Sequence, residues 1–174
     1  IGELLTLKKL KEKYGKTLVC CTYNTTNTCE EYISYKTHPD LPCLTAIRMS
    51  SNLPLIFERF NYQNCFYIDG GICDNFPILE AEKYGENIIG VCVHISLTSL
   101  RDKPEEGIMS YIYKILQIPI RQTVYNNTEK CTKKPLIIDL KGDGKGNFFD
   151  FALKSKERLD MFSDGYQTVK KILK

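Results

Sequence analysis

The 174-residue sequence has no tryptophan, only two histidines, and no apolar run of the ~18–20 residues that a membrane-spanning helix needs. It has no C-x-x-C pair, and with so few histidines a zinc site is not expected. Neither sign of charge dominates, since 24 basic side chains stand against 21 acidic ones for a net charge of +3. Without a basic stripe, a nucleic-acid partner is not expected. What remains is the composition of an ordinary globular protein, with 43% hydrophobic and 26% charged residues.

The sequence also lacks an initiator methionine. It begins at Ile1, and no charged-then-apolar leader comes before it. We therefore expect that an upstream part of the polypeptide was removed or is missing. The length suits one domain, and no internal repeat, low-complexity tract or linker divides it. We expect residues 1–174 to form one folding unit, or a large part of one.

Eight cysteines and two N-x-Thr sequons, at Asn24 and Asn126, would fit a secreted protein with disulfide bonds. The positions of the cysteines argue against it. Cys20, Cys21 and Cys92 lie in apolar, strand-like runs, where a free thiol behaves as a small hydrophobe. Cys20 and Cys21 are adjacent and would point to opposite faces of a strand. We therefore favour a reducing, cytoplasmic environment.

Helix and strand patterns alternate with short connections, which predicts an α/β fold. We expect strands at residues 17–23, 31–36, 55–60, 65–68, 87–95 and 135–140. We expect helices at residues 3–14, 77–84, 105–125 with an interruption at Pro119, and 152–173, and a short helix through Ala46, Ile47 and Met49 that Pro54 ends. The continuous apolar runs at 17–23 and 87–95 are typical of strands buried on both faces.

The segment FYIDGGICDNFPI, residues 66–78, places chemistry at a strand end. Asp69 directly follows the apolar strand, and Gly70 and Gly71 follow it. In open α/β sheets, sites form beyond the carboxyl ends of strands. The two glycines would allow a sharp turn with positive φ and a close approach of substrate. Asp69 is then a candidate to act as a general base or to orient one, although a strand-to-helix aspartate more usually caps a turn or a helix.

Three motifs in order carry a resemblance: Met49-Ser50-Ser51-Asn52-Leu53-Pro54, then Asp69-Gly70-Gly71, then Asp74-Asn75-Phe76-Pro77. This set resembles the patatin-like phospholipases, whose domains carry an A-S-S-A-I-P-like stretch, a short hairpin, a D-G-G or D-G-A motif and a D-N-x-P continuation. Weaker similarity extends along the chain at residues 15–19, 38–42, 87–94, 149–151 and 165–166. The ordered set is more specific than D-G-G alone.

The resemblance implies a patatin-like three-layer α/β/α fold with a mostly parallel sheet, here expected to be incomplete at its N-terminal side. It also implies a serine–aspartate dyad without histidine. In that dyad Asp69 accepts the serine's proton, the serine attacks an ester carbonyl, and the acyl-enzyme is hydrolysed. Gly70 and Gly71 would support Asp69. The substrate would be a phospholipid or neutral lipid ester, met at a membrane surface, and neither cofactor nor metal would be needed.

The chain departs from the family in one important respect. The G-x-S-x-G elbow and the glycine-rich oxyanion loop occur nowhere in the 174 residues. Ser50 and Ser51 lie in a short helix before Pro54, and we interpret them as packing and capping residues. We therefore expect the chain to be the C-terminal portion of a patatin-like domain, unable to hydrolyse esters without its N-terminal half. The alternative is a non-catalytic relative with a role in lipid binding or protein interaction.

Other patterns have structural interpretations. His38 lies in a proline-rich turn and His94 ends a strand, so both are expected to be structural. The run 139–150 has a faint calcium-loop spacing, but Lys141 places a cation where a ligand belongs, so we expect a flexible turn and no metal. Residues 108–120 could form an acyl-binding wall or a membrane-docking face, and a buried core helix is the simpler prediction.

Overall fold

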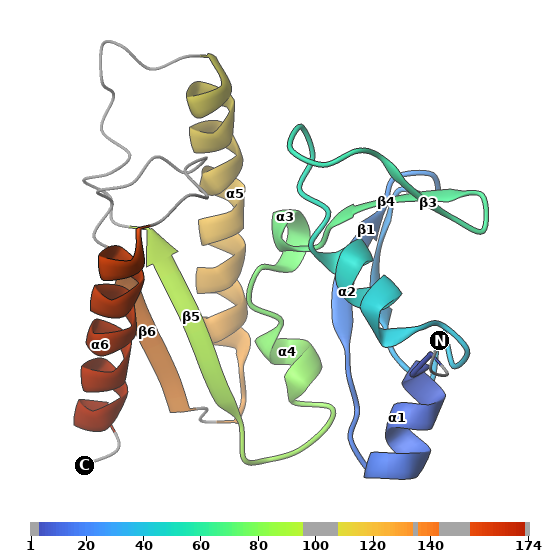
Figure 1. The fold of residues 1–174 in the computed structure, drawn as a ribbon, viewed down its shortest axis with the longest axis horizontal. Helices are drawn as coiled ribbons and strands as arrows, with labels where there is room; N and C mark the ends of the chain where they lie inside the picture. The colour runs from blue at the N-terminus through green and yellow to red at the C-terminus, as the bar shows by residue number, and fades with distance from the viewer. Residues whose placement is uncertain (1–3, 96–107, 134–135, 143–153, 173–174) are drawn as a thin grey trace. The chain divides into compact units, whose positions relative to one another are not determined.

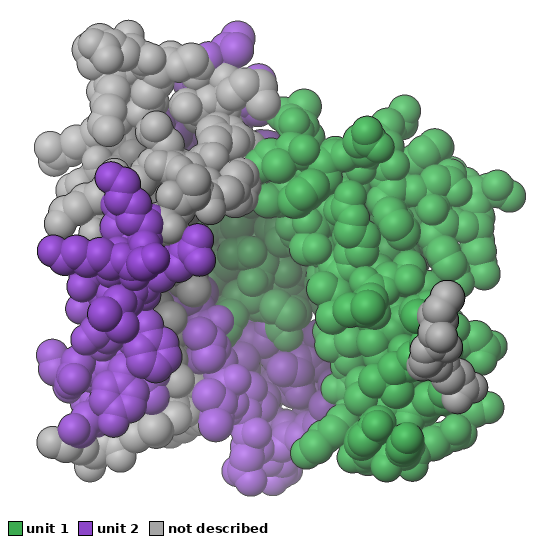
Figure 2. All heavy atoms as spheres, viewed as in Figure 1, with its two compact units in different colours: residues 1–77, 119–126 green, residues 78–118, 127–174 purple. Residues whose placement is uncertain are grey.

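The computed structural model describes residues 4–95, 108–133, 136–142 and 154–172 (Figure 1). The chain divides into two compact units, coloured in Figure 2. Unit 1 comprises residues 1–77 and 119–126, and unit 2 comprises residues 78–118 and 127–174. Both contain helices and strands, which confirms the predicted α/β class.

Unit 1 is built on a four-stranded sheet with the order β2-β1-β4-β3, and each pair of neighbours is antiparallel. The strands are β1 (Cys20–Asn24), β2 (Cys29–Ile33), β3 (Phe60–Tyr62) and β4 (Cys65–Asp69). The helices are α1 (Leu7–Tyr14), α2 (Cys43–Ser50) and the single turn α3 (Gly71–Asp74). In the central pair, Thr22 of β1 lies opposite Asp69 of β4.

The core of unit 1 lies where α2 packs on β1 and β4. Its buried members are Leu7, Cys20, Ile33, Leu41, Cys43, Ala46, Met49 and Tyr67. Successive residues of β1 are buried, including Cys20, Cys21 and Thr22, so both faces of this strand are covered. The burial predicted from its continuous apolar run is confirmed. All eight cysteines lie in the described part of the chain, and none of them forms a disulfide bond.

Local turns explain why neighbouring strands run antiparallel. Between β1 and β2, the Asn24 side-chain oxygen accepts hydrogen bonds from the Thr26 and Asn27 amides at 3.1 and 3.0 Å. Between β3 and β4 the turn consists of Gln63 and Asn64, with φ of 48° and 63°. Two consecutive positive φ angles define the tight turn that matches strand twist in hairpins. Both connections are therefore hairpins rather than crossovers.

Helix α1 is capped at both ends, as its sequence predicts. The Thr6 hydroxyl accepts from the Lys9 amide at 3.2 Å, and Gly15 closes the helix in the left-handed conformation with φ of 65°. The predicted turn at residues 38–42 also supports the helix start, since the Leu7 amide donates to the Leu41 carbonyl at 3.0 Å. The helix itself is shorter than the predicted 3–14.

Unit 2 contains a parallel pair of strands, β5 (Ile89–Ile95) and β6 (Leu136–Gly142). Its helices are α4 (Ile78–Ala81), α6 (Ser155–Ile172) and the parts of α5 (Ile108–Lys130) outside residues 119–126. Helix α6 packs against β6. Strands and helices were predicted at these places, with ends displaced by a few residues.

A carboxylate ties the end of α4 to the segment after α5 within unit 2. Glu82 Oε1 accepts from the Thr132 and Lys133 amides at 2.6 and 2.7 Å, and from the Thr132 hydroxyl and Cys131 thiol at 3.0 and 3.2 Å. These donors, led by the Lys133 amide, lower the pKa of Glu82 to about 2. The contact is a charge-assisted clamp between segments about fifty residues apart.

The predicted mostly parallel sheet is wrong for the larger sheet. Among the described residues, the parallel pairing is confined to β5 and β6. The α/β alternation in the sequence suggested crossover connections, but β1–β2 and β3–β4 are joined by hairpins, and hairpins impose antiparallel neighbours. β4 then returns beside β1, also antiparallel.

Several predicted boundaries were also wrong. The predicted strand at 55–60 does not begin at Leu55, because the φ of 71° at this residue lies outside the range of β-strands. Helix α5 runs through Pro119 without a break. Proline removes one amide donor, and the turns on both sides continue around it. The predicted helix 77–84 is regular only over Ile78–Ala81, with turns beyond.

Burial in unit 2 differs from two expectations. Strand β5 was predicted to be buried on both faces, yet Ile89 and Val91 are exposed while Cys92 is buried. Helix α5 was predicted to be a core helix, yet several of its apolar side chains are largely exposed, namely Ile108, Tyr111, Ile115 and Ile118. Periodicity identified the elements but not which faces are covered.

Candidate active site around Asp69

Asp69 is held at the end of β4 by the main chain that follows α2. Its amide donates to the Asn52 carbonyl at 3.0 Å, and the Gly70 amide makes a longer contact, 3.4 Å, with the Ser50 carbonyl. These two contacts bring together the two ends of the stretch 53–68. The backbone position of Asp69 depends on α2 as well as on the sheet.

Thr22 adds a buried side-chain tie beneath Asp69. Its side chain is fully buried, and its hydroxyl lies 2.8 Å from the Ile68 carbonyl and 3.3 Å from the Met49 carbonyl. The hydroxyl has one hydrogen, so the shorter contact to Ile68 is the bond it makes. Thr22 therefore joins β1 to the last peptide before Asp69, with the end of α2 close by.

Asn52 braces the other side of β4. It is 1% exposed, its Nδ2 donates to the Tyr67 carbonyl at 2.9 Å, and its Oδ1 accepts from Arg48 at 2.7 Å. The Arg48 guanidinium in turn lies over two aromatic rings, 4.9 Å from the Phe57 centroid and 5.8 Å from that of Phe60. The stacked guanidinium holds the amide, and the amide holds β4.

The Asp69 carboxylate has one anchored oxygen and one open oxygen. Oδ1 accepts a 2.7 Å hydrogen bond from the Gly71 amide, whereas Oδ2 accepts none from the residues that the structure describes. The side chain is half-buried, and this burial raises the pKa of Asp69 above its ordinary value, opposed by the Gly71 bond. A fixed carboxylate of raised basicity with a lone pair to spare is suited to accept a proton.

The two glycines serve this geometry, but for a different reason from the one predicted. Gly70 has φ of −69° and ψ of −20°, and the positive-φ glycine within the described part of the chain is Gly15. The prediction of positive φ was therefore wrong. A Cβ on Gly70 would lie 2.3 Å from the Cys21 carbonyl carbon and oxygen. Gly70 is needed because α3 begins in direct contact with the backbone of β1.

A side chain at Gly71 would meet less steric hindrance than one at Gly70. A Cβ there would meet the Asn75 side-chain oxygen at 2.7 Å and Asp69 Oδ1 at 3.0 Å. The Asn75 side chain is exposed and can rotate away, whereas the Asp69 carboxylate would have to shift slightly to avoid a close contact with the new Cβ. The residue matters chiefly through its amide, which any residue type except proline would supply.

Among the described residues, the side chains of the other candidates make no hydrogen bond to Asp69. Ser51 closes α2 and its hydroxyl donates to the Ile47 carbonyl at 2.9 Å, as expected for a capping serine. Ser50 contributes its carbonyl to the Gly70 contact. His38 is half-buried in the 38–42 turn, where its Nδ1 finds no hydrogen-bond partner among the described residues. The side chain of His94 falls outside the described residues.

The run with calcium-loop spacing lies mostly outside the described residues as well, since 143–150 are not among them. In the ranges that are described, no three His, Cys, Asp or Glu side chains come together as metal ligands would.

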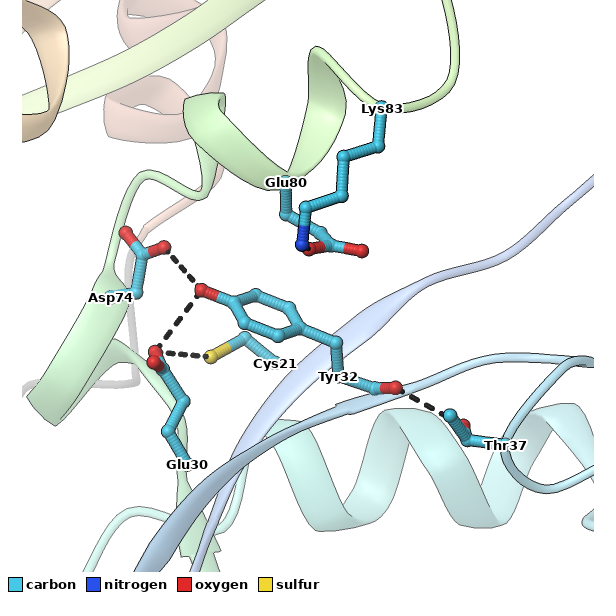
Figure 3. Close-up of polar contacts among 7 residues, drawn as sticks. All are labelled: Cys21, Glu30, Tyr32, Thr37, Asp74, Glu80 and Lys83. Atoms are coloured by element: carbon cyan, nitrogen blue, oxygen red, sulfur yellow. Dashed lines mark hydrogen bonds and ion pairs between the residues drawn. The ribbon is translucent and has the colours of Figure 1, made fainter. Parts of the chain in front are cut away.

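Sequence reasoning missed a hydrogen-bonded cluster behind α3, drawn in Figure 3. Asp74 is 5% exposed, and the Tyr32 hydroxyl of β2 lies 2.7 Å from its Oδ2. The same hydroxyl lies 3.2 Å from Glu30 Oε1, and the Cys21 thiol lies 3.5 Å from that oxygen. Asp74 was visible as part of the D-N-x-P motif, but nothing in the sequence connected it to Tyr32, 42 positions earlier.

An aspartate at a strand end, oriented by the amide of a following glycine in a mixed α/β unit, defines a candidate hydrolytic site of the carboxylate-base type. The comparisons with known proteins agree with this class. The family model "Patatin-like phospholipase" matches residues 3–82, just under half of the chain. The matched part includes Asp69, Gly70 and Gly71.

A similar protein is "Probable lipid hydrolase 463L" of Invertebrate iridescent virus 6, which is 42% identical over 84 residues. The match covers 48% of this chain and 29% of the viral protein. The chain thus spans less than a third of the length of that relative. Over the described residues, no helix combines the length and apolar character that crossing a membrane requires.

Proposed function

We propose that this chain supplies the aspartate of a serine–aspartate lipid acyl hydrolase, with Asp69 as the general base. The observation that carries the proposal is the Asp69 carboxylate, with Oδ1 fixed by the Gly71 amide at 2.7 Å and Oδ2 without a donor among the described residues. Support comes from the patatin-like match over residues 3–82 and from the similarity to a protein named as a probable lipid hydrolase.

The chemistry requires Asp69 to be ionised in the resting state yet basic enough to accept a proton. Half-burial raises its pKa, and the Gly71 bond keeps that rise in check. A serine hydroxyl placed at Oδ2 would lose its proton to Asp69 as its oxygen attacks the ester carbonyl. The same carboxylate then gives the proton to the leaving alcohol, and water hydrolyses the resulting acyl-enzyme. No step requires a histidine.

The nucleophile must come from another stretch of sequence. No G-x-S-x-G occurs in the 174 residues, and the Ser51 hydroxyl is bonded to its own helix. The substrate class that fits the proposal is a glycerophospholipid or neutral lipid ester presented at a membrane surface. The rival proposal is a patatin-like scaffold that binds lipid or a protein partner without catalysis.

A chimera tests the proposal directly. In the viral relative, the stretch corresponding to residues 3–82 is replaced by those residues of this chain, and the relative's own activity on phospholipid vesicles and short-chain nitrophenyl esters is measured first. We expect the chimera to hydrolyse the esters that the relative hydrolyses. Asp69→Asn in the chimera should reduce kcat/KM by roughly three orders of magnitude or more, because the amide cannot accept the proton.

The matched control is Asp40→Asn, an exposed aspartate in the 38–42 turn, which should retain activity. If the Asp69→Asn chimera keeps the turnover of the unsubstituted chimera, Asp69 is not the base. If the chimera folds but binds lipid without turnover, the non-catalytic proposal is favoured.

A further inference from the structure

The orientation of Asp69 depends on α3, and α3 cannot hold itself in place. This helix is a single turn of four residues, Gly71–Asp74, far below the length at which a helix is stable alone. Its first residue provides the Gly71 amide that binds Asp69 Oδ1. Whatever fixes α3 on the sheet therefore also fixes the direction of that amide.

The start of α3 is held by the backbone contact of Gly70 with β1. Its last residue, Asp74, is held by the 2.7 Å contact with the Tyr32 hydroxyl. Tyr32 lies on β2, which pairs with β1, and β1 pairs with β4. The contact from Tyr32 to Asp74 thus closes a ring of elements, β4 to α3 to β2 to β1, around the turn that follows Asp69.

The proton on Tyr32 determines which contact is the bond. One hydroxyl hydrogen cannot serve both Asp74 at 2.7 Å and Glu30 at 3.2 Å, and the shorter, buried contact is favoured. Glu30 is exposed, and its Oε1 also accepts from the Cys21 thiol. Burial, followed by the bond to Asp74, raises the pKa of Tyr32, so the hydroxyl remains a donor at physiological pH. Figure 3 shows the hydroxyl lying between the two carboxylates.

We propose that Tyr32 is a positioning residue for Asp69: its bond to Asp74 fixes α3, and with it the Gly71 amide that orients the Asp69 carboxylate. The catalytic consequence rests on the proposed function, but the geometric one does not. Tyr32 touches neither the substrate nor the reacting oxygen. It acts through Asp74, the four residues of α3, and one amide.

The geometric test uses the 174-residue chain and nuclear magnetic resonance. In Tyr32→Phe we expect the Gly71 amide hydrogen to exchange roughly tenfold faster or more, since a charge-assisted bond has been loosened. We also expect the carboxyl carbon of Asp69 to titrate at a higher pH, because the Gly71 bond lowers its pKa. Tyr35→Phe, at a half-buried tyrosine three positions along, is the control and should change neither signal.

Asp74→Asn provides an independent variant, since it keeps an acceptor oxygen but loses the charge. It should shift both signals in the same direction by a smaller amount, and it decides the matter if Tyr32→Phe does not fold. Unchanged Gly71 exchange and an unchanged Asp69 titration in whichever of these variants folds would overturn the positioning role.

The catalytic test places Tyr32→Phe in the chimera. We expect kcat to fall roughly tenfold with KM nearly unchanged, because orientation of the base affects the transition state rather than lipid binding. Equal kcat for Tyr32→Phe and the unsubstituted chimera would overturn the catalytic part. Failure of the proposed function can be told apart from failure of the positioning role. If only the proposed function fails, activity survives Asp69→Asn while Tyr32→Phe still changes the magnetic resonance signals.

Discussion

Replacing Gly70 by alanine tests how closely α3 approaches the sheet. The added Cβ would lie 2.3 Å from the Cys21 carbonyl carbon and oxygen and 2.6 Å from the Thr22 amide nitrogen. Heavy atoms in good contact lie ~3.5 Å apart, so the two backbones must separate by about 1 Å. The obstacle is the main chain of a strand covered on both faces, which cannot rotate away as a side chain can.

Overpacking of this kind costs typically about 1–3 kcal/mol, and a rigid obstacle favours the upper end. We expect Gly70→Ala to lower the free energy of unfolding by about 3 kcal/mol. With an m-value of about 2 kcal/mol/M, the urea midpoint should fall by about 1.5 M. The measurement is urea unfolding of the 174-residue chain followed by far-ultraviolet circular dichroism, since the chain has no tryptophan to report by fluorescence.

Gly71→Ala is the matched control at the next position. Its Cβ meets the exposed Asn75 side chain, which can move, so we expect a cost under about 1 kcal/mol. A Gly70→Ala chain with a native spectrum and a midpoint equal to wild type would refute the close approach. The close approach is refuted as well if Gly71→Ala proves the more destabilising of the two.

Carboxyl groups with shifted pKa values give two further predictions. Burial raises the folded-state pKa of Asp69, so its ionisation costs stability, and this cost appears as the pH rises through the window above the unfolded value of 3.8. Asp69→Asn should therefore melt at or above the wild-type Tm at pH 7, and a clearly lower Tm would contradict this explanation. Glu82 has the opposite sign, because its folded-state pKa is lowered to about 2 and its stabilising clamp is present above the unfolded value of 4.5. The Thr132 and Lys133 amides should lose protection from hydrogen exchange as the pH falls towards 2. Glu82→Gln should reduce the protection of the same amides at pH 6. Unchanged protection in both experiments would exclude the clamp.

The sequence predicted those features that depend on local pattern. Capping residues located α1, apolar runs located β1 and β5, and the position of Asp69 at a strand end was confirmed. Pairing was not predictable in the same way. One of the two neighbours of β4 is β1, more than forty residues earlier, and the apolar run of a strand is compatible with either direction of its neighbours.

The sequence also did not reveal why particular residues are needed at their positions. Gly70 was expected to be necessary, but a close backbone contact and a positive φ produce the same residue choice, and only the three-dimensional structure separates them. In the sequence, Tyr32 looks like an ordinary aromatic residue of a strand. Its partner Asp74 lies 42 positions later and comes close to it only in the folded structure. The role of Asp69 remains a prediction, and its geometry is the part that the structure supplies.

The hydrogen bond that the Asp69 amide donates to the Asn52 carbonyl has a consequence for how this region can change length. It joins the two ends of residues 53–68, so the stretch between them behaves as a closed loop mounted on a fixed base. Lengthening such a loop is inexpensive, since doubling its residues costs only about 0.6 kcal/mol in closure entropy. The turn at Gln63 and Asn64, at the far end of this loop, is therefore a place for inserting a peptide tag or reporter. Such an insertion should leave Asp69 where it is.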